Sequence, residues 1–398
     1  MPVKPPFTIV IYKDFFSNGR GAGRATAALA NALVNRGFTV HVITRQLSHE
    51  PLFVTFKSDV CLHFYPIQKA WKGKLLLNKI LLRTRLGMNL LEQVFPQFDI
   101  LRERSAQLQL LVSTLHPDIV IAAGTNESVE LMHHTPSPLA IPWVQMFHVY
   151  PPVCFKKNKY QRVRRLERTL RTAAACQVLL PSHEQALRPY TSAPIAVIGN
   201  ALPYAPKHPL PQFTSRNRHM VYVAYFSKDK NHAMLLRAFA RLTRSDAWIL
   251  DLYGSGTPQE EQQLHAQVEA LGIASRVRFM GITTNVRSIF EQAGICVYPS
   301  RVEGFGLALA EAMWFGLPCV GFRNAPGVNE LIQNGDTGLL AEEFTAESFA
   351  VQLQRLIDNP SLRERLGESA SRFVRARYTE DVVFGAWEKL LTDLCPRR

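Results

Sequence analysis

Residues 295–321 read ICVYPSRVEGFGLALAEAMWFGLPCVG, and the order of elements in this stretch indicates an α/β fold. A short apolar run ends in a loop that contains Gly304 and Gly306, and a helix rich in alanine and leucine follows. The first N–H groups of such a helix have no partners within the helix and can bind an anion. Glu303 precedes the turn and Glu311 lies in the helix. Because carboxylates repel anions, we expect these two to bind neutral hydroxyl groups beside the anion.

The alternation of strand and helix recurs on both sides of a proline-rich segment, residues 203–211, which we expect to be a linker between domains. Ahead of it the sequence predicts strands at 7–12, 39–44, 118–123 and 140–146, with a helix at 24–36. Behind it the sequence predicts strands at 220–225, 247–253, 277–280, 295–298 and 319–321, with helices at 233–242 and 259–271. This pattern predicts two tandem doubly wound parallel-sheet domains, in which ligands bind beyond the carboxyl ends of the strands.

The net charge of the chain lies in its first half. The protein has 398 residues, of which 47% are hydrophobic and 20% charged, so it has the composition of an ordinary globular protein. Its 46 basic and 32 acidic residues give a net charge of +14. Residues 1–210 hold 25 basic and 11 acidic side chains, a net charge of +14, whereas residues 211–398 hold 21 of each. We therefore expect the first half to face an anionic partner.

Around residues 295–321 the sequence resembles family 4 of the glycosyltransferases. The resemblance rests on Glu303 and Glu311, an E-x7-E pattern in PSRVEGFGLALAEAMWFGLPCVG, and on NAPGVNELIQNGDTGLL at 324–340. It extends upstream to YVAYFSKDKNHAMLLRAFARL and DLYGSG, and it is weaker in RGAGRATAALANALVNRGFTVHVIT and IPWVQMFHVY. The resemblance implies a GT-B fold and a retaining transferase, with an acceptor-binding domain at 1–205 and a nucleotide-sugar domain at 212–375. It also implies that a C-terminal helix, 379–398, returns to the first domain.

The resemblance also implies roles for single residues. Glu303 would hold hydroxyl groups of the donor sugar, and Glu311 the ribose of the nucleotide. Lys230 would neutralise the leaving diphosphate. The other implied donor-site and catalytic residues are Gly21, His148, Gly304, Phe305, Gly306 and Leu307, of which the last four follow Glu303 in the glycine turn.

Two positions depart from the family pattern. The family usually has an arginine five residues before the lysine, and here that position is Tyr225. Lys228, Arg20 or Arg24 are candidates to supply the missing cation. The paired N-terminal glycines of the family are here Arg20 and Gly21, and Gly23 stands where the family has an acidic residue.

Two basic stretches account for much of the charge of the first half. Residues 69–91 interleave cations with leucines and contain no acidic residue before Glu92, which is typical of a helix in a membrane interface. Residues 156–171 read KKNKYQRVRRLERTLR. An anionic membrane surface or a phosphorylated glycolipid acceptor is the expected partner, a solvated helix face is the alternative, and nucleic acid is not expected because no binding motif accompanies the charge. The candidate residues are Lys69, Lys72, Lys74, Lys79, Arg83, Arg85, Lys156, Lys157, Arg162, Arg164 and Arg165.

Several kinds of chemistry have no support in the sequence. It contains no D-x-D pair, no H-E-x-x-H and no P-loop, so we expect neither a metal nor another cofactor. The six cysteines form no C-x-x-C pair, and the first apolar run is shorter than the core of a signal peptide. We therefore expect a cytoplasmic protein that associates with the inner face of the cytoplasmic membrane.

The expected function is transfer of a sugar from a nucleotide diphosphate sugar, with UDP-hexose favoured over GDP-mannose, to a cell-envelope glycan or glycolipid. Lipopolysaccharide or a lipid-linked oligosaccharide would be such an acceptor. Within enzymes, a sugar-nucleotide epimerase or a phosphorylase on the same fold is an alternative. A membrane- or nucleic-acid-binding scaffold with a decayed donor site is the alternative from another class.

Overall fold

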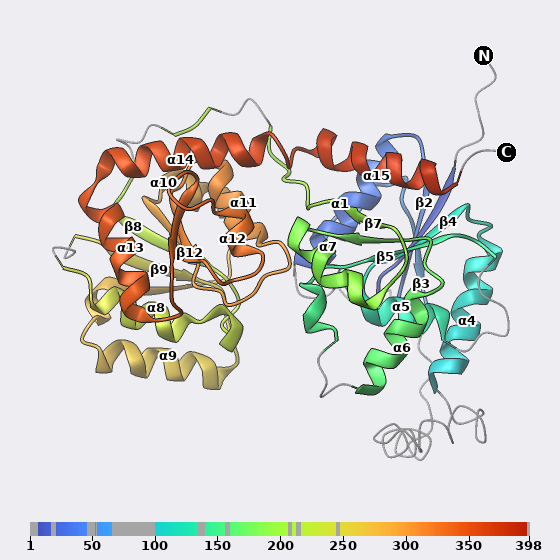
Figure 1. Ribbon diagram of the computed structural model, residues 1–398, viewed down its shortest axis with the longest axis horizontal. Helices are drawn as coiled ribbons and strands as arrows, with labels where there is room; N and C mark the ends of the chain where they lie inside the picture. Colours follow the sequence, from blue (N-terminus) through green and yellow to red (C-terminus); the bar gives the residue numbers. More distant parts are fainter. Residues whose placement is uncertain are drawn as a thin grey trace. The chain divides into compact units, whose positions relative to one another are not determined.

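A computed structural model describes residues 7–16, 21–45, 52, 54–65, 100–133, 140–155, 160–205, 209–211, 216–243 and 247–395. The chain divides into two compact units. The N-terminal unit comprises Met1–Ala201 together with Glu380–Arg398, and the C-terminal unit comprises Leu202–Thr379. Each unit is built on its own parallel sheet (Figure 1).

The sheet of the N-terminal unit has seven strands in the order β3-β2-β1-β4-β5-β6-β7. The strands are short and mostly buried on both faces, as expected for a parallel sheet covered by helices. They are β1 (Thr8–Tyr12), β2 (Thr39–Thr44), β3 (Cys61–Phe64), β4 (Ile119–Ala122), β5 (Trp143–Met146), β6 (Ala175–Val178) and β7 (Ile195–Val197). The strands pair in parallel, so the carboxyl ends of β1, β4 and β5 share one edge.

Helices cover both faces of this sheet (Figure 1). Helices α4, α5 and α6 pack in a row, and α1 packs against β2 and α15. Their bounds are α1 (Gly21–Asn35), α4 (Ile100–Thr114), α5 (Thr125–Met132), α6 (Tyr160–Leu170), α7 (Pro181–Leu187) and α15 (Glu380–Leu394), with 3-10 turns η3 (Pro151–Val153) and η5 (Arg188–Tyr190). The sequence predicts α1 only from residue 24, but the helix already includes Gly21 because Gly23 and Thr26 face the buried side.

The last helix of the chain, α15, belongs to the N-terminal unit and is held there by Arg36 at the end of α1. The Arg36 guanidinium lies 3.5 Å from Glu388 and 3.7 Å from Asp381, and it covers the ring of Phe384. Trp387 of α15 is buried. The packing of α15 is therefore both apolar and ionic.

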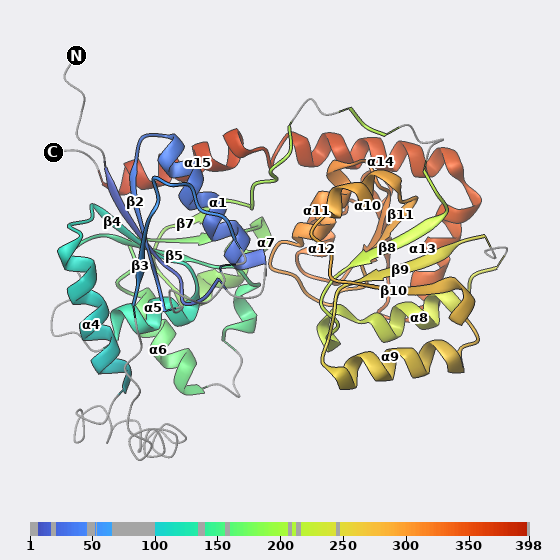
Figure 2. The ribbon, with the colours of Figure 1, turned by 180° about the vertical axis from the view of Figure 1, so that it is seen from behind.

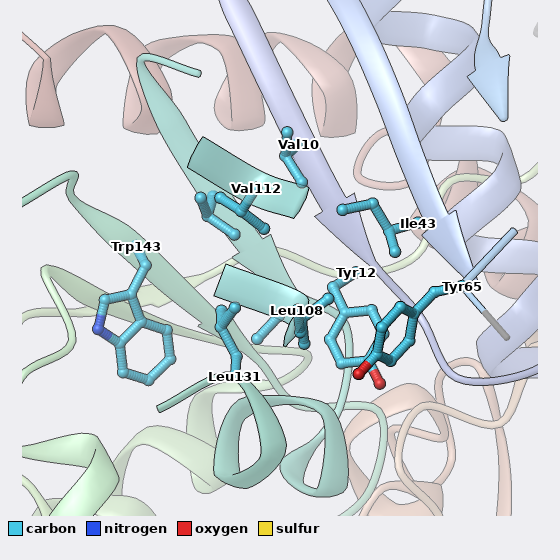
Figure 3. Close-up of a cluster of buried hydrophobic side chains, with 10 residues drawn as sticks. Val10, Tyr12, Ile43, Tyr65, Leu108, Val112, Leu131 and Trp143 are labelled. Atoms are coloured by element: carbon cyan, nitrogen blue, oxygen red, sulfur yellow. The ribbon is translucent and has the colours of Figure 1, made fainter. Parts of the chain in front are cut away.

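The apolar core under the carboxyl edge of the N-terminal sheet is shown in Figure 3. Tyr12 and Trp143, from the first and fifth strands, are almost fully buried. They pack with Val112 and Leu108 of α4 and with Leu131 of α5. At roughly 25 cal/mol per Å² of buried apolar surface, large aromatic side chains dominate the stability of such a core. This packing fixes the ends of β1 and β4.

The sheet of the C-terminal unit has six strands in the order β10-β9-β8-β11-β12-β13, again all parallel. The strands are β8 (His219–Val223), β9 (Ile249–Tyr253), β10 (Val277–Gly281), β11 (Ile295–Val297), β12 (Cys319–Phe322) and β13 (Gly338–Ala341). The predicted fold class, two doubly wound parallel-sheet domains, is confirmed. The chain order reverses between β8 and β11, which makes the space beyond these two strands the expected ligand site of this unit.

Helices α8, α9 and α13 lie on one face of this sheet and α10, α11, α12 and α14 on the other, as Figure 2 shows from behind. Their bounds are α8 (His232–Ala240), α9 (Pro258–Ala270), α10 (Val286–Gln292), α11 (Leu307–Trp314), α12 (Val328–Leu331), α13 (Ala346–Asp358) and α14 (Pro360–Arg375), with 3-10 turns η7 (Lys228–Lys230) and η8 (Ala274–Arg276). In the part of the chain that the structure describes, no helix combines the length and the apolar character needed to cross a membrane.

Candidate functional site

The loops after β8 and β11 bring Lys230 and Glu303 together at the reversal point of the C-terminal sheet. Nζ of Lys230 lies 2.5 Å from Oε1 of Glu303. The two side chains are 24% and 10% exposed, so the pair is largely shielded but still reaches solvent. The two residues are 73 positions apart in sequence, and only the sheet order makes them neighbours.

Polar contacts between the two loops fix the position of Lys230. The hydroxyl of buried Tyr222 donates to the carbonyl of Lys230 at 3.0 Å and lies 2.8 Å from Oγ of Ser300. Asn231 adopts left-handed backbone geometry, with φ of 61°, and its amide donates to the carbonyl of Pro299 at 3.3 Å. Asparagine tolerates this conformation better than most residues. The lysine is thus held in place by both loops, through residues that the sequence analysis did not identify.

Glu303 is positioned by the loop that follows β12. Its backbone N–H donates to the carbonyl of Pro326 at 2.9 Å. Gly327 has φ of 83°, and a Cβ at this position would lie 2.6 Å from the carbonyl oxygen of Glu303. Glycine is required here both by the backbone conformation and by the close approach. The resemblance included this loop, but it did not identify Gly327 as the residue against which Glu303 packs.

The helix after Glu303, α11, begins at Leu307 with Gly306 as its N-cap. Gly306 has φ of 81° and offers no side chain to cap the helix. The first N–H groups of an α-helix have no intrahelical acceptor, and no N-cap side chain caps them in α11. This arrangement can bind phosphate. Phe305 anchors the turn, because it is buried and its ring meets that of Tyr378 edge-on, with centroids 4.9 Å apart. Gly304 completes the turn, so the residues predicted from Gly304 to Leu307 lie beside Glu303.

Glu311, the second carboxylate of the pattern, is buried inside the C-terminal unit, with 1% of its surface exposed. The hydroxyl of Tyr204 donates to its Oε1 at 3.3 Å. The Tyr204 ring also packs against Trp314 and Phe315 at the end of α11. The hydrogen bond orients one carboxylate oxygen, and Tyr204 is a further residue that the sequence analysis missed.

Next to Lys230, His232 is buried between aromatic rings. Its ring lies 4.7 Å from the rings of both Tyr222 and Phe226, and neither nitrogen has a hydrogen-bond partner among the described residues. Burial, and to a lesser extent the charge of Lys230, lowers the pKa of His232 to about 3. Tyr225, which replaces the arginine of the family, is 45% exposed, and Lys228 is exposed as well.

In the N-terminal unit, His148 contacts Thr26 in α1, the helix that begins at Gly21. Thr26 donates to the carbonyl of Ala22 at 2.8 Å, and its Oγ1 lies 3.4 Å from Nε2 of His148. His148 follows β5 and is partly buried. Burial, together with the charge of Lys13, lowers the pKa of His148 to about 3. His148 is therefore a neutral imidazole at physiological pH.

A charged cluster at the same edge was not predicted. Lys13 pairs with Glu127 across the ends of β1 and β4, and Arg45 pairs with Asp14 and with Glu130, the latter at 3.3 Å. Burial raises the pKa of both Glu127 and Glu130, and the neighbouring cations Lys13 and Arg45 oppose that shift. The signal that points to the cluster is positional, because its members stand directly after predicted strands or within a few residues of them.

Most of the basic residues predicted to meet a membrane or an acceptor lie outside the described residues. This applies to Lys69, Lys72, Lys74, Lys79, Arg83, Arg85, Lys156 and Lys157, and to the side chain of Arg162. Arg20, a candidate for the missing diphosphate cation, also lies outside the described residues. Arg164 is half-buried. Arg165 is only 7% exposed, so its guanidinium does not lie on the surface as the prediction required. The helical spacing of α6 turns Arg165 to the side that also carries buried Leu166 and Thr169.

Among the described residues, no group of three His, Cys, Asp or Glu side chains could hold a metal ion.

Residues 209–373 match the family model of the group 1 glycosyl transferases. An uncharacterized glycosyltransferase of Haemophilus influenzae is 31% identical over 198 residues, which cover 50% of this chain and 55% of that protein. The lipopolysaccharide core biosynthesis glycosyltransferase LpsE of Rhizobium meliloti is 28% identical over 166 residues, 42% of this chain and 47% of that protein. The chain thus spans about half the length of the curated relatives it matches. These matches support the group 1 glycosyltransferase family for this part of the chain.

Solved structures match nearly the whole chain. Sucrose-phosphate synthase from Thermosynechococcus elongatus superposes with a TM-score of 0.78 at 18% identity, over 98% of this chain and 99% of that one. Anabaena HepE, in complex with UDP and glucose, superposes with a TM-score of 0.73 at 16% identity, over 97% and 100%. At these identities the likeness shows the fold alone, and that fold is the GT-B fold implied by the resemblance.

Proposed function

We propose that this protein is a retaining glycosyltransferase that transfers a sugar from a nucleotide diphosphate sugar to a glycan or glycolipid acceptor of the cell envelope. The observation that carries the proposal is the Lys230–Glu303 pair at the reversal point of the C-terminal sheet, beside the uncapped start of α11. A cation, free backbone N–H groups and a carboxylate suit the diphosphate and the hydroxyl groups of one sugar nucleotide.

The proposed roles follow from charge and position. The departing nucleoside diphosphate gains negative charge, and Lys230 with the N–H groups near Phe305, Gly306 and Leu307 would stabilise it in the transition state. Glu303 would accept hydrogen bonds from the donor sugar. Buried Glu311, oriented by Tyr204, would accept hydrogen bonds from the ribose.

The reaction we propose breaks the bond between the anomeric carbon and the diphosphate, and forms a bond from the acceptor oxygen to the same face of that carbon. The leaving phosphate would take the acceptor proton. His148, neutral at physiological pH, suits a hydrogen bond to a hydroxyl group rather than a charge interaction. Gly21, at the start of α1, would let the backbone of the N-terminal unit approach the reacting sugar.

We propose that the diphosphate is neutralised by the protein without a divalent metal, since Lys230 provides a fixed positive charge. Transfer should then continue in excess EDTA. Complete loss in the chelator, restored by manganese, contradicts this part of the proposal.

UDP-hexose is the favoured donor and GDP-mannose the alternative. HepE, which shares the fold, was crystallised with UDP and glucose, and this supports UDP. The partial match to LpsE supports a lipopolysaccharide-type acceptor. The net charge of +14 in residues 1–210 supports association with the anionic inner face of the cytoplasmic membrane.

A thermal-shift panel of UDP- and GDP-sugars tests the proposal, because a ligand that binds the native state raises the melting temperature. We expect one donor to raise the melting temperature. We also expect the protein to transfer the sugar of that donor to an added glycolipid extract. Failure to bind any nucleoside diphosphate sugar, together with tight binding to anionic vesicles or nucleic acid, would instead support a scaffold with a decayed donor site. Hydrolysis or other turnover of the donor without an acceptor would support a sugar-nucleotide epimerase or a phosphorylase.

A further inference from the structure

The described part of the linker between the two units lies along the C-terminal end of α11. The ring of Tyr204 packs against Trp314 and Phe315, with centroids 5.9 Å and 4.8 Å away. Further along the linker, Leu210 lies against Gly316, where a Cβ would be 3.2 Å from the leucine side chain. These contacts hold the linker on the helix that begins in the glycine turn. The linker is therefore a strap over α11 as well as a connection.

One polar contact of this strap reaches a residue of the proposed donor site. The hydroxyl of Tyr204 donates to Oε1 of Glu311 at 3.3 Å. Hydroxyl groups usually hydrogen-bond to oxygen at about 2.5–3.0 Å, so this bond is long and weak. Packing against Trp314 and Phe315 needs only the aromatic ring, whereas the hydroxyl is directed at the carboxylate.

The burial of Glu311 makes the position of Tyr204 important for access. Glu311 is only 1% exposed, whereas Tyr204 is partly exposed. A ligand cannot reach so deeply buried a carboxylate unless a group that covers it moves. Tyr204 is such a group, because it contacts the carboxylate and reaches solvent itself.

The same segment carries one of the two chain crossings between the units. The C-terminal unit begins at Leu202 and ends at Thr379. The two crossings are joined, because the N–H of Leu202 donates to the carbonyl of Tyr378 at 2.8 Å. The ring of Tyr378 in turn meets that of Phe305 in the glycine turn edge-on. Tyr204 therefore stands two residues from a joint that contacts the proposed diphosphate site.

We propose that Tyr204 is a placeholder for the donor ribose: its hydroxyl occupies Oε1 of Glu311 until a ribose hydroxyl takes that position, and the exchange releases the linker from α11. One neutral O–H donor replaces another at the same carboxylate oxygen, so the exchange costs little free energy. The diphosphate does not compete for this oxygen, because both are negatively charged. The inference rests on the proposed transferase function, in which Glu311 binds the ribose, and it makes the linker respond to the nucleoside part of the donor.

The test compares UDP with 2′,3′-dideoxy-UDP, which has the same base and diphosphate but no ribose hydroxyl groups. Calorimetry on the full-length protein measures both affinities in wild type, Tyr204→Phe and Tyr190→Phe. Phenylalanine at 204 keeps the ring packing and removes the competing hydroxyl. We expect Tyr204→Phe to bind UDP about threefold to tenfold more tightly, which is the net contribution of one neutral hydrogen bond, and to bind the dideoxy nucleotide with unchanged affinity. Tyr190→Phe is the matched control, a tyrosine of the N-terminal unit whose ring stacks on Phe155, and it should change neither affinity.

Hydrogen exchange of wild type gives a second readout that needs no variant. The N–H groups of Leu202 and Tyr204 donate to the carbonyls of Tyr378 and Leu202, so their exchange reports release of the linker. We expect UDP to speed the exchange of residues 202–205 at least threefold, and the dideoxy nucleotide to leave it unchanged.

An unchanged or lower UDP affinity of Tyr204→Phe overturns the inference, because the hydroxyl then does not compete with the ribose. Equal changes for the two nucleotides, or exchange of residues 202–205 that UDP slows or leaves unchanged, also overturn it. If Tyr204→Phe fails to fold, the exchange of wild type decides alone. If wild type binds only guanosine nucleotides, GDP and its dideoxy analogue replace the uridine pair. If wild type binds no nucleoside diphosphate at all, the proposed function itself fails, so the two failures are distinguishable.

Discussion

The ammonium of Lys230 lies 2.5 Å from the carboxylate of Glu303. The side chain proposed to bind the diphosphate and the side chain proposed to bind the sugar therefore neutralise each other in the protein. A bound diphosphate competes with Glu303 for Lys230. The pair would then open when the donor binds, and each member would take over a different part of the sugar nucleotide.

Replacement of Glu303 by glutamine tests this competition. Glutamine keeps the size of the side chain but removes the charge that occupies Lys230. We expect Glu303→Gln to bind UDP as tightly as wild type or more tightly, while sugar transfer falls roughly 100-fold because a polar contact to the reacting sugar is weakened. Calorimetry with UDP and a radiolabel transfer assay provide the two readouts. A parallel loss of UDP affinity would argue against separate roles for the two residues.

Gly327 and Gly335 provide a matched pair of substitutions. Both have φ of 83°, but a Cβ would clash with the Glu303 backbone at Gly327 and would meet nothing within 4 Å at Gly335. Alanine at either position costs about 1 kcal/mol for the left-handed backbone. We expect chemical denaturation to show this loss in both variants, with a larger loss for Gly327→Ala. Only Gly327→Ala should lower the transfer rate, and equal rates in the two variants would contradict the positioning of Glu303 by this loop.

Buried His232 makes the C-terminal unit sensitive to acid. Its pKa is lowered from 6.5 to about 3 in the folded protein, so below pH 6.5 the unfolded chain binds more protons than the native state. Stability from this group is present above pH 6.5 and is lost as the pH falls toward 3. His232→Phe, which suits the surrounding rings of Tyr222 and Phe226, should flatten the decline of unfolding free energy between pH 6.5 and 4. Urea titrations across that range measure it, and an unchanged slope would show that other groups dominate.

The pKa of His148 depends on the charge of Lys13 in the N-terminal cluster. The positive charge of Lys13 contributes to the lowering of its pKa. Lys13→Met removes that charge and leaves Glu127 unpaired, and both changes favour the protonated imidazole. We expect the pKa of His148, followed by ¹⁵N-detected NMR, to be higher in Lys13→Met than in wild type. A pKa that stays the same or falls would place Lys13 too far from His148 to influence it.

The sequence predicted the elements with strong local signals. Residues 295–321 form β11, α11 and β12 as expected, because a glycine turn separates an apolar strand from an alanine-rich helix. The strand predictions do not include β3, β6, β7 or β13, which have four, four, three and four residues. Runs this short give a weak periodic pattern, and β11 is equally short but was recognised from the glycine turn and helix that follow it. The strands β3 and β7 form the two edges of the N-terminal sheet. Their position in the sheet comes from pairing with β2 and β6.

Local patterns predict only the part of the candidate site that residues close in sequence form, whereas Lys230 and Glu303, 73 positions apart, were assigned to one site through the family resemblance. Gly304 to Leu307 surround Glu303 in sequence and in space. The Lys13–Glu127 pair joins residues 114 positions apart, and no local motif marks either one. Their shared signal, a charged residue soon after a predicted strand, becomes specific only when the strand order is known.

The most direct measurement is a calorimetric titration of UDP into wild type, Lys230→Ala and Arg237→Ala. Arg237 is an exposed cation on α8, so its replacement removes the same charge from the same unit away from the proposed site. We predict saturable binding to wild type and Arg237→Ala, and at least tenfold weaker binding to Lys230→Ala with an unchanged melting temperature of the free protein. Equal UDP affinity in all three proteins would contradict a diphosphate site at Lys230.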